Sequence, residues 1–211
     1  MRFLMGVVLA AQLLAQEELI DRIAVVVGKA IVKDSDIDRD IRVTEFLNHE
    51  PLRVDHAEQK KAAQRLVDQV LLREEIRVGG YGSATNEQVS AALEGARKTR
   101  GEQEGPFAAS LKSYGLTVAN LRDQLRWQLT VLRFVDARFQ PAATVADSAA
   151  DAYYRQHEAA LRRAHPEASS EELHAAARTL MTDEEVNRLL FSWLDERRKS
   201  ASVKFLEEGL A

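Results

Sequence analysis

Residues 20–41, IDRIAVVVGKAIVKDSDIDRDI, contain two short apolar runs separated by Gly28-Lys29. This pair suits a two-residue hairpin turn, because glycine in the first position accepts a positive φ. The polar stretch Ser35-Asp36-Ile37-Asp38 then predicts the N-cap of a helix. A hairpin of two strands is only marginally stable in water. The stretch therefore predicts a hairpin over 20–33 that needs a further strand or a helical cover from elsewhere in the chain.

A third strand is predicted close to the C-terminus. Residues 202–206, SVKFL, are short, begin by alternating, and contain Val and Phe. Between the hairpin and this segment, residues 34–199 show apolar residues at three- and four-residue intervals, which is typical of amphipathic helices. A charged linker is expected at 102–106, and the pattern leaves open a break at Thr182-Asp183. We predict a mainly α fold of several helices with a small antiparallel sheet built from both ends of the chain.

The N-terminus has the order of a secretory signal peptide. Met1-Arg2 is followed by the apolar run 3–14 and then by Ala15, with polar residues from Gln16 onward. The apolar run is well short of the roughly 20 residues that cross a bilayer. A buried N-terminal helix or a membrane anchor is the alternative interpretation. We predict cleavage between Ala15 and Gln16, which leaves 16–211 as a single exported domain without stable insertion in a membrane.

Composition narrows the classes of function. The chain has 211 residues, of which 45% are hydrophobic and 29% charged, as in an ordinary globular protein. Its net charge of −4 argues against a general binder of nucleic acid or anionic membranes. Arg122, Arg126 and Arg133, with Trp127 nearby, are instead predicted to form the solvated face of an amphipathic helix. The chain has no cysteine, which excludes disulfides, zinc–thiolate sites and a thiol nucleophile.

No catalytic, cofactor or metal site is predicted. Asp34, Asp36 and Asp38, with Glu45 in the twelfth position, nearly fit a calcium-binding loop. However, Arg39 occupies the position where that loop needs glycine, and acidic residues at a helix N-terminus explain the same pattern. The five histidines show no HExxH spacing, and no nucleotide-binding loop is present. No pair of carboxylates is set apart in an apolar environment, as acid–base catalysis would need.

The hairpin followed by SDID, the later Gly115-Leu116-Thr117 helix start, and the C-terminal FSWLDERRKSASVKFLEE together resemble SurA-type periplasmic chaperones. The resemblance extends over 18–207. It implies one chaperone core formed by the N-terminal and C-terminal segments, in which parvulin-type prolyl isomerase domains normally interrupt the chain. Here only about 30 residues separate Tyr154 from the family-like final helix, fewer than a small domain needs. We therefore expect the parvulin domains, and their activity, to be absent.

The resemblance implies an ATP-independent periplasmic chaperone that binds unfolded outer-membrane or secreted proteins. Two alternatives stay open: a reduced prolyl isomerase, or one acting with a partner, and a non-catalytic helical adaptor that binds one folded protein. Client contacts are predicted for four aromatic residues, although aromatic residues at helical spacing more often belong to a core: Trp127, Tyr153, Tyr154 and Trp193.

Overall fold

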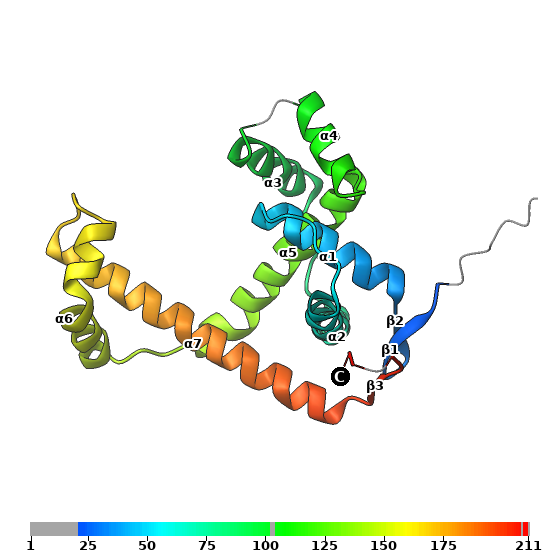
Figure 1. The fold of residues 1–211 in the computed structure, drawn as a ribbon. Helices are drawn as coiled ribbons and strands as arrows, with labels where there is room; N and C mark the ends of the chain where they lie inside the picture. The colour runs from blue at the N-terminus through cyan, green and yellow to red at the C-terminus, as the bar shows by residue number, and fades with distance from the viewer. Residues whose placement is uncertain (1–20, 102–103, 208, 211) are drawn as a thin grey trace, which may run out of the picture.

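The computed structural model describes residues 21–101, 104–207 and 209–210. The predicted signal peptide and its cleavage site between Ala15 and Gln16 lie outside these residues. Within the described part, helices form most of the chain and a small sheet lies at one end of the molecule (Figure 1). The prediction of a mainly α fold with a small antiparallel sheet is therefore confirmed.

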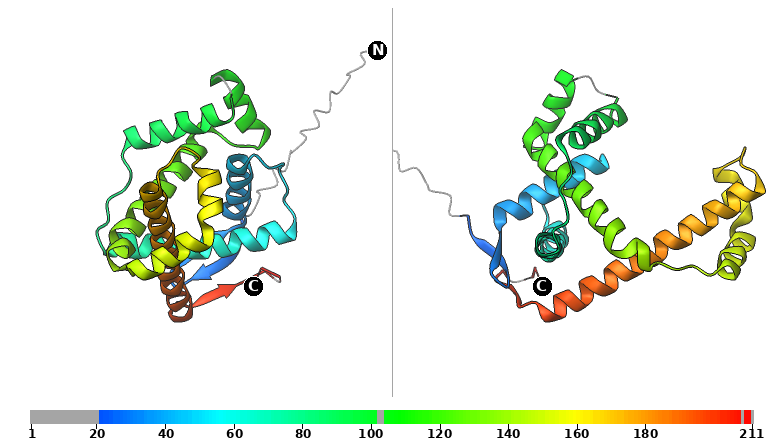
Figure 2. Two further views of the ribbon diagram at one scale, coloured as in Figure 1. Left: turned by 90° about the vertical axis from the view of Figure 1, so that its left-hand side faces the viewer. Right: turned by 180° about the vertical axis from the view of Figure 1, so that it is seen from behind.

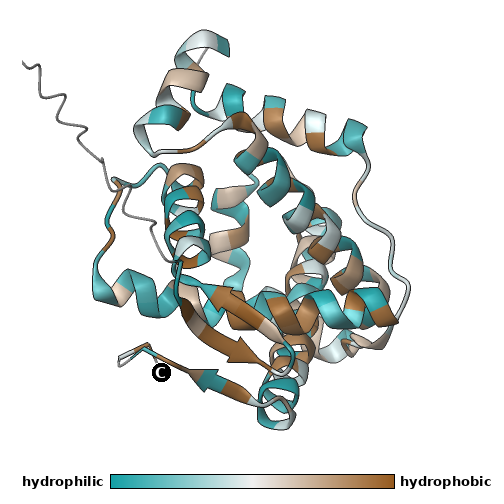
Figure 3. Cartoon of the chain, turned by 90° about the vertical axis from the view of Figure 1, so that its right-hand side faces the viewer, coloured by the Kyte–Doolittle hydropathy of each residue, from teal (hydrophilic) through white to brown (hydrophobic). Residues whose placement is uncertain are grey.

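The sheet joins the two ends of the described chain. Strand β1 (Ile23–Val27) lies in the centre and pairs antiparallel with β2 (Ala30–Lys33) and with β3 (Val203–Phe205). Gly28 has a φ of 59°, which the two-residue turn requires and which a side chain would disfavour. Figure 3 shows the hairpin strands coloured mostly as hydrophobic. The third strand predicted from the sequence is thus present, and within the described residues β2 and β3 are the two edges of the sheet.

Helix α1 (Asp34–Asn48) follows β2 without a loop. Its N-cap is Lys33, so the prediction of a cap within Ser35–Asp38 was wrong by a few residues. The physical reason is that Asp36 occupies the third helical position, where its carboxylate accepts the backbone N–H of Lys33 at 3.1 Å. Helix α2 (His56–Val78) begins after Asp55, whose side chain accepts the N–H of Glu58 at 3.0 Å.

Helices α3 (Asn86–Thr99), α4 (Glu104–Ser113) and α5 (Val118–Phe139) pack against the second half of α1. The expected linker at 102–106 is shorter than predicted, because α4 already begins at Glu104. Pro106 is accommodated there since the first turn of a helix has backbone N–H groups that need no partner within the helix. A short 3-10 helix, η1 (Gln140–Ala142), ends α5 at Pro141.

Helices α6 (Asp147–Ala164) and α7 (Ser170–Ser200) form an antiparallel pair. Helix α7 is continuous, so the break considered at Thr182-Asp183 does not occur. Its C-terminal half packs on α2 and α5, where Arg198 of α7 lies 2.6 Å from Asp68 of α2. We call residues 147–182, which comprise α6, the loop after it and the N-terminal part of α7, the α6–α7 arm. Figures 1 and 2 show that the arm extends away from α1, α3 and α4.

Four apolar clusters hold these elements together. The first joins the sheet to α1 and α2, and it includes Leu210 from the C-terminal end. The second joins α1, α3, α4 and α5, and the third joins α2, α5 and α7. The fourth is small and lies within the arm, between α6 and α7. The body of the molecule therefore has a continuous set of contacts, whereas the arm depends on its own small cluster.

Candidate functional site

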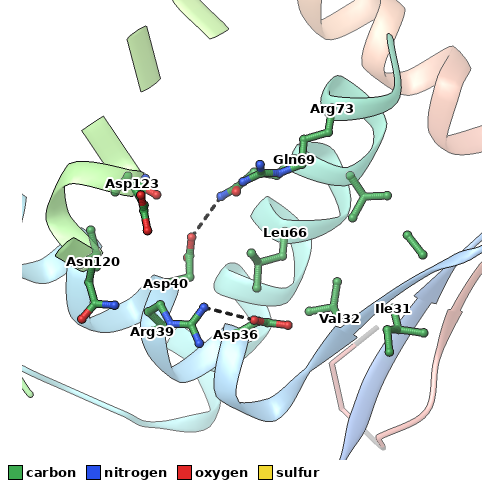
Figure 4. A pocket seen from close by; sticks show the side chains of 14 residues that line it. Ile31, Val32, Asp36, Arg39, Asp40, Leu66, Gln69, Arg73, Asn120 and Asp123 are labelled. Atoms are coloured by element: carbon green, nitrogen blue, oxygen red, sulfur yellow. Dashed lines mark hydrogen bonds and ion pairs between the residues drawn. The ribbon is translucent and has the colours of Figure 1, made fainter. Parts of the chain in front are cut away.

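A groove runs between α2 and α5 and consists of two clefts that share Arg73 and Asp123. The first cleft, of about 460 Å³, is bordered by β2, α1, α2 and the start of α5 (Figure 4). The second, of about 580 Å³, continues along α2 and α5 to Tyr81 and Trp127. Because the two clefts share lining residues, they offer one elongated site and not two separate holes.

The first cleft combines apolar side chains with charges that are already paired. Arg39 lies 3.4 Å from Asp36 within α1, and Arg65 of α2 lies 2.6 Å from Asp40 of α1. The apolar part of the lining comes from the sheet and from α1 and α2, and consists of Ala30, Ile31, Val32, Val43, Leu66 and Val70. Such a mixture suits a polypeptide, which has both apolar side chains and polar backbone groups.

Asp40 is the most deeply buried acidic group in this lining, with its side chain only 5% exposed. Its Oδ2 accepts hydrogen bonds from Nε and Nη2 of Arg65, at 2.9 and 2.6 Å, and its Oδ1 accepts one from Gln69 at 3.2 Å. Burial nevertheless raises the pKa of Asp40 above its ordinary value, because desolvation outweighs the attraction of Arg65. Both carboxylate oxygens are used in joining α1 to α2.

Arg73 has a different environment. Its guanidinium lies over the indole ring of Trp127, 4.1 Å from the ring centroid, which places a cation against an aromatic face. Burial of the guanidinium lowers the pKa of Arg73. No carboxylate within residues 21–101, 104–207 and 209–210 forms an ion pair with it. The groove therefore contains a partly desolvated cation at the point where its two clefts meet.

The four aromatic residues predicted to contact clients do not form one surface. Trp127 lines the second cleft, half-buried beneath Arg73. Trp193 of α7 packs into the cluster between α2, α5 and α7, with its ring 5.9 Å from Phe134. Tyr153 and Tyr154 lie in the arm, where Tyr154 is buried and stacked on His174 at 3.7 Å. Trp127 is thus the predicted residue that lies at the groove.

The three arginines of α5 that were predicted on a solvated face are partly or fully exposed, but they also form hydrogen bonds to other elements. Arg122 lies 3.4 Å from the hydroxyl of Ser90, Arg126 donates to Asn86 at 2.8 Å, and Arg133 donates to the carbonyl of Ser83 at 2.7 Å. These contacts attach α5 to the start of α3 and to the loop before it. The prediction missed them because the partners lie more than 30 residues away in the chain.

The acidic residues that suggested a calcium loop have other partners. Asp34 accepts from Arg22 at 3.0 Å, Asp36 caps α1, and Asp38 accepts from Arg42 at 2.6 Å. In the part of the chain that the structure describes, no group of three His, Asp or Glu side chains could hold a metal ion. Helix capping and local ion pairs therefore account for this acidic run.

Arg73 and the edge of β2 were not predicted from the sequence as site components. A signal was available on α2, where Leu66, Gln69, Val70 and Arg73 follow one another at three- and four-residue intervals and so share a face. That spacing groups the residues, but it does not show that the face lines an open groove. This depends on where α5 lies, and the local sequence of α2 carries no information on it.

No protein-family model and no curated protein matches the chain. Among solved structures, a match is found in work on PEB4 and Cj1289 of Campylobacter jejuni, which are described as two structurally related SurA-like chaperones. The match has a TM-score of 0.56 and 12% sequence identity, and it covers 88% of this chain and 99% of the other. The chain therefore shares its fold with a SurA-like chaperone. None of its described helices has the length and apolar character needed to cross a membrane.

Proposed function

We propose that this protein is a periplasmic chaperone that binds unfolded outer-membrane or secreted proteins without ATP and without catalysis. The observation that carries the proposal is the fold shared with a SurA-like chaperone over 88% of the chain. The groove between α2 and α5 supports it, because this groove offers apolar and polar groups in an elongated arrangement. Export is supported by the N-terminal sequence, in which cleavage between Ala15 and Gln16 would release the mature protein.

Binding would be driven by burial of apolar surface, at roughly 25 cal/mol for each Å² removed from water. Apolar side chains outside the groove extend the available surface: Leu132 of α5 and Phe191 of α7 are each 59% exposed, and Leu180 of α7 is 47% exposed. Because each contact of this kind is weak and unspecific, a client can be held and released without a chemical step. This mechanism fits a chaperone that meets many sequences.

The proposal that the protein is not an enzyme rests on the structure that residues 147–200 form. In the family that the sequence resembles, parvulin domains normally interrupt the chain before the final helix. Here this interval forms α6 and α7, which pack against each other. We expect no acceleration of prolyl isomerisation.

The decisive experiment compares three activities of the purified protein. We expect it to suppress the aggregation of several unfolded outer-membrane proteins at near-stoichiometric ratios, with ATP having no effect. A proline-dependent increase in the refolding rate of a test protein would favour the reduced isomerase instead. Binding to a single folded protein, with no effect on unfolded chains, would favour the adaptor. Fractionation of the host, with sequencing of the mature N-terminus, tests export and the cleavage site.

A further inference from the structure

Among the described residues no strand pairs with the outer edge of β2, and this edge presents backbone hydrogen-bonding groups at Ile31. In a two-residue hairpin, the pair next to the turn, here Val27 and Ala30, exchanges both hydrogen bonds, and the following pair exchanges none. That following pair is Val26 and Ile31. The backbone of β1 alternates accordingly, since Gly28 donates to Ser202 and Ala24 accepts from Leu206 on the β3 side. The N–H and C=O of Ile31 therefore point away from the sheet.

The surroundings of this edge are those of a binding site. Lys33, the next residue on β2 with outward backbone groups, has its N–H satisfied by Asp36, so Ile31 is the available position. Its side chain is 47% exposed, and Ile31 and Arg73 both line the first cleft (Figure 4). Within the described residues, Arg73 has no carboxylate partner, whereas the other charged side chains of the cleft are ion-paired: Asp36 with Arg39, Asp40 with Arg65, and Asp123 with Arg126. The unmatched charge of the cleft is thus positive.

We propose that the groove takes an extended client segment that adds a strand at Ile31 of β2 and places an acidic side chain against Arg73. This inference rests on the proposed function and specifies the class of segment that is bound: extended, apolar, and bearing an internal Asp or Glu. Strand addition satisfies the outward N–H and C=O of Ile31, as in other proteins that extend a sheet edge. A guanidinium pairs with a carboxylate by two parallel hydrogen bonds, which no neutral side chain reproduces.

The charge component is tested with two peptides of eight residues that are apolar except for one central Glu in the first and Gln in the second. Fluorescence anisotropy with the purified protein should show about tenfold tighter binding of the Glu peptide, as expected for a hydrogen bond to a charged group. Arg73→Gln should abolish this preference, and Arg73→Lys should keep part of it. Arg163→Gln, on the arm, changes an exposed arginine outside the groove and should leave the preference intact.

The strand component is tested with N-methyl groups placed at successive backbone positions of the Glu peptide. Strand addition at Ile31 predicts a loss of affinity at the one position whose N–H faces the carbonyl of Ile31, and little loss at the positions on either side, whose N–H groups face away from β2. Ile31→Pro should weaken binding as well. It removes only an outward N–H, and edge strands tolerate proline where the N–H faces solvent. If this variant does not fold, the methylated peptides still decide the question with the unaltered protein.

Two results would overturn the inference: equal affinity for the Glu and Gln peptides, or an effect of N-methylation that does not depend on position. If either occurs while aggregation of unfolded proteins is still suppressed, the chaperone function stands and this mode of binding is wrong. If neither unfolded proteins nor peptides bind, the proposed function fails, and the inference fails with it.

Discussion

At the scale of single residues, Asp40 shows how the burial of a carboxylate can make the stability of the fold decrease with rising pH. The pKa of Asp40 is raised above 3.8 because burial opposes ionisation more strongly than Arg65 favours it. The folded protein therefore binds a proton at this site more tightly than the unfolded chain. Stability from this group is present at low pH and is lost as the pH rises from about 3.8 through the folded pKa.

The variant Asp40→Asn isolates this effect from the other carboxylates. The free energy of unfolding of the natural protein, relative to that of Asp40→Asn, should fall between pH 4 and pH 7. Urea unfolding at several pH values measures both. The Arg65 side chain is 37% exposed, so solvent can reach it when its partner is lost in the variant. A relative stability that rises with pH would show that the ion pair with Arg65 outweighs desolvation.

A substitution of Val25 in β1 tests how much the stability of the protein depends on one position of the sheet. Its side chain is fully buried, and the residue pairs with Val32 on one side and with Phe205 on the other. Val25→Asp should lower the free energy of unfolding by more than about 3 kcal/mol, because a charge would enter an apolar cluster without a partner. Ile31→Asp on β2 is the matched control and should change stability by less than about 1 kcal/mol. Equal effects of the two variants, measured by thermal unfolding, would contradict the assignment of the buried face.

At the scale of elements, the α6–α7 arm should open independently of the body. Its apolar cluster has only four buried residues, Tyr154, Leu161, Leu173 and Ala177. Regions with few buried contacts unfold locally at lower free energy than the global transition. Leu173→Ala removes a fully buried side chain from that cluster and should cost the arm about 2–4 kcal/mol.

Hydrogen exchange followed by mass spectrometry distinguishes this opening from global unfolding. In Leu173→Ala, exchange should speed up in residues 147–182 and stay unchanged in the sheet. Leu180→Ala lies on the same helix, but Leu180 is 47% exposed, so its substitution should alter neither region. Faster exchange in β1 would mean that the arm and the body unfold together.

The sequence can predict where individual helices begin and end. Helix starts follow from local pairs of residues. Thr85, Thr117 and Ser169 each precede a helix, and each has a side chain that accepts the backbone N–H three residues later, a pattern that the sequence itself contains. The end of α2 is local in the same way, since Gly79-Gly80 follows the helix and the Tyr81 N–H donates to the carbonyl of Ile76. The groove could not be predicted in this way. Arg73 and Asp123 are far apart in the chain and line the same groove only because of how α2 and α5 are arranged in the fold.

At the scale of the whole molecule, the fold is closed by its two ends. Strand β1 near the N-terminus pairs with β3 near the C-terminus, and Leu210, only 2% exposed, inserts into the cluster that joins the sheet to α1 and α2. The returning strand could be predicted from the sequence, but this last apolar contact could not. Because of this closure, the stability of the molecule depends on β3 and Leu210, close to the C-terminal end of the described residues.

Leu210→Ala should therefore destabilise the entire body, by about 2–4 kcal/mol, since it leaves a cavity in the first cluster. Trp127 and Trp193 lie in a different cluster, between α2, α5 and α7. Tryptophan fluorescence during urea unfolding therefore tests whether the substitution at Leu210 also destabilises that cluster. We expect the fluorescence transition and the helical circular dichroism signal to move together to lower urea. Leu206→Ala is the control, because Leu206 is 57% exposed and its backbone bond to Ala24 is unaffected. A fluorescence transition that stays in place would show that Leu210 stabilises only the sheet.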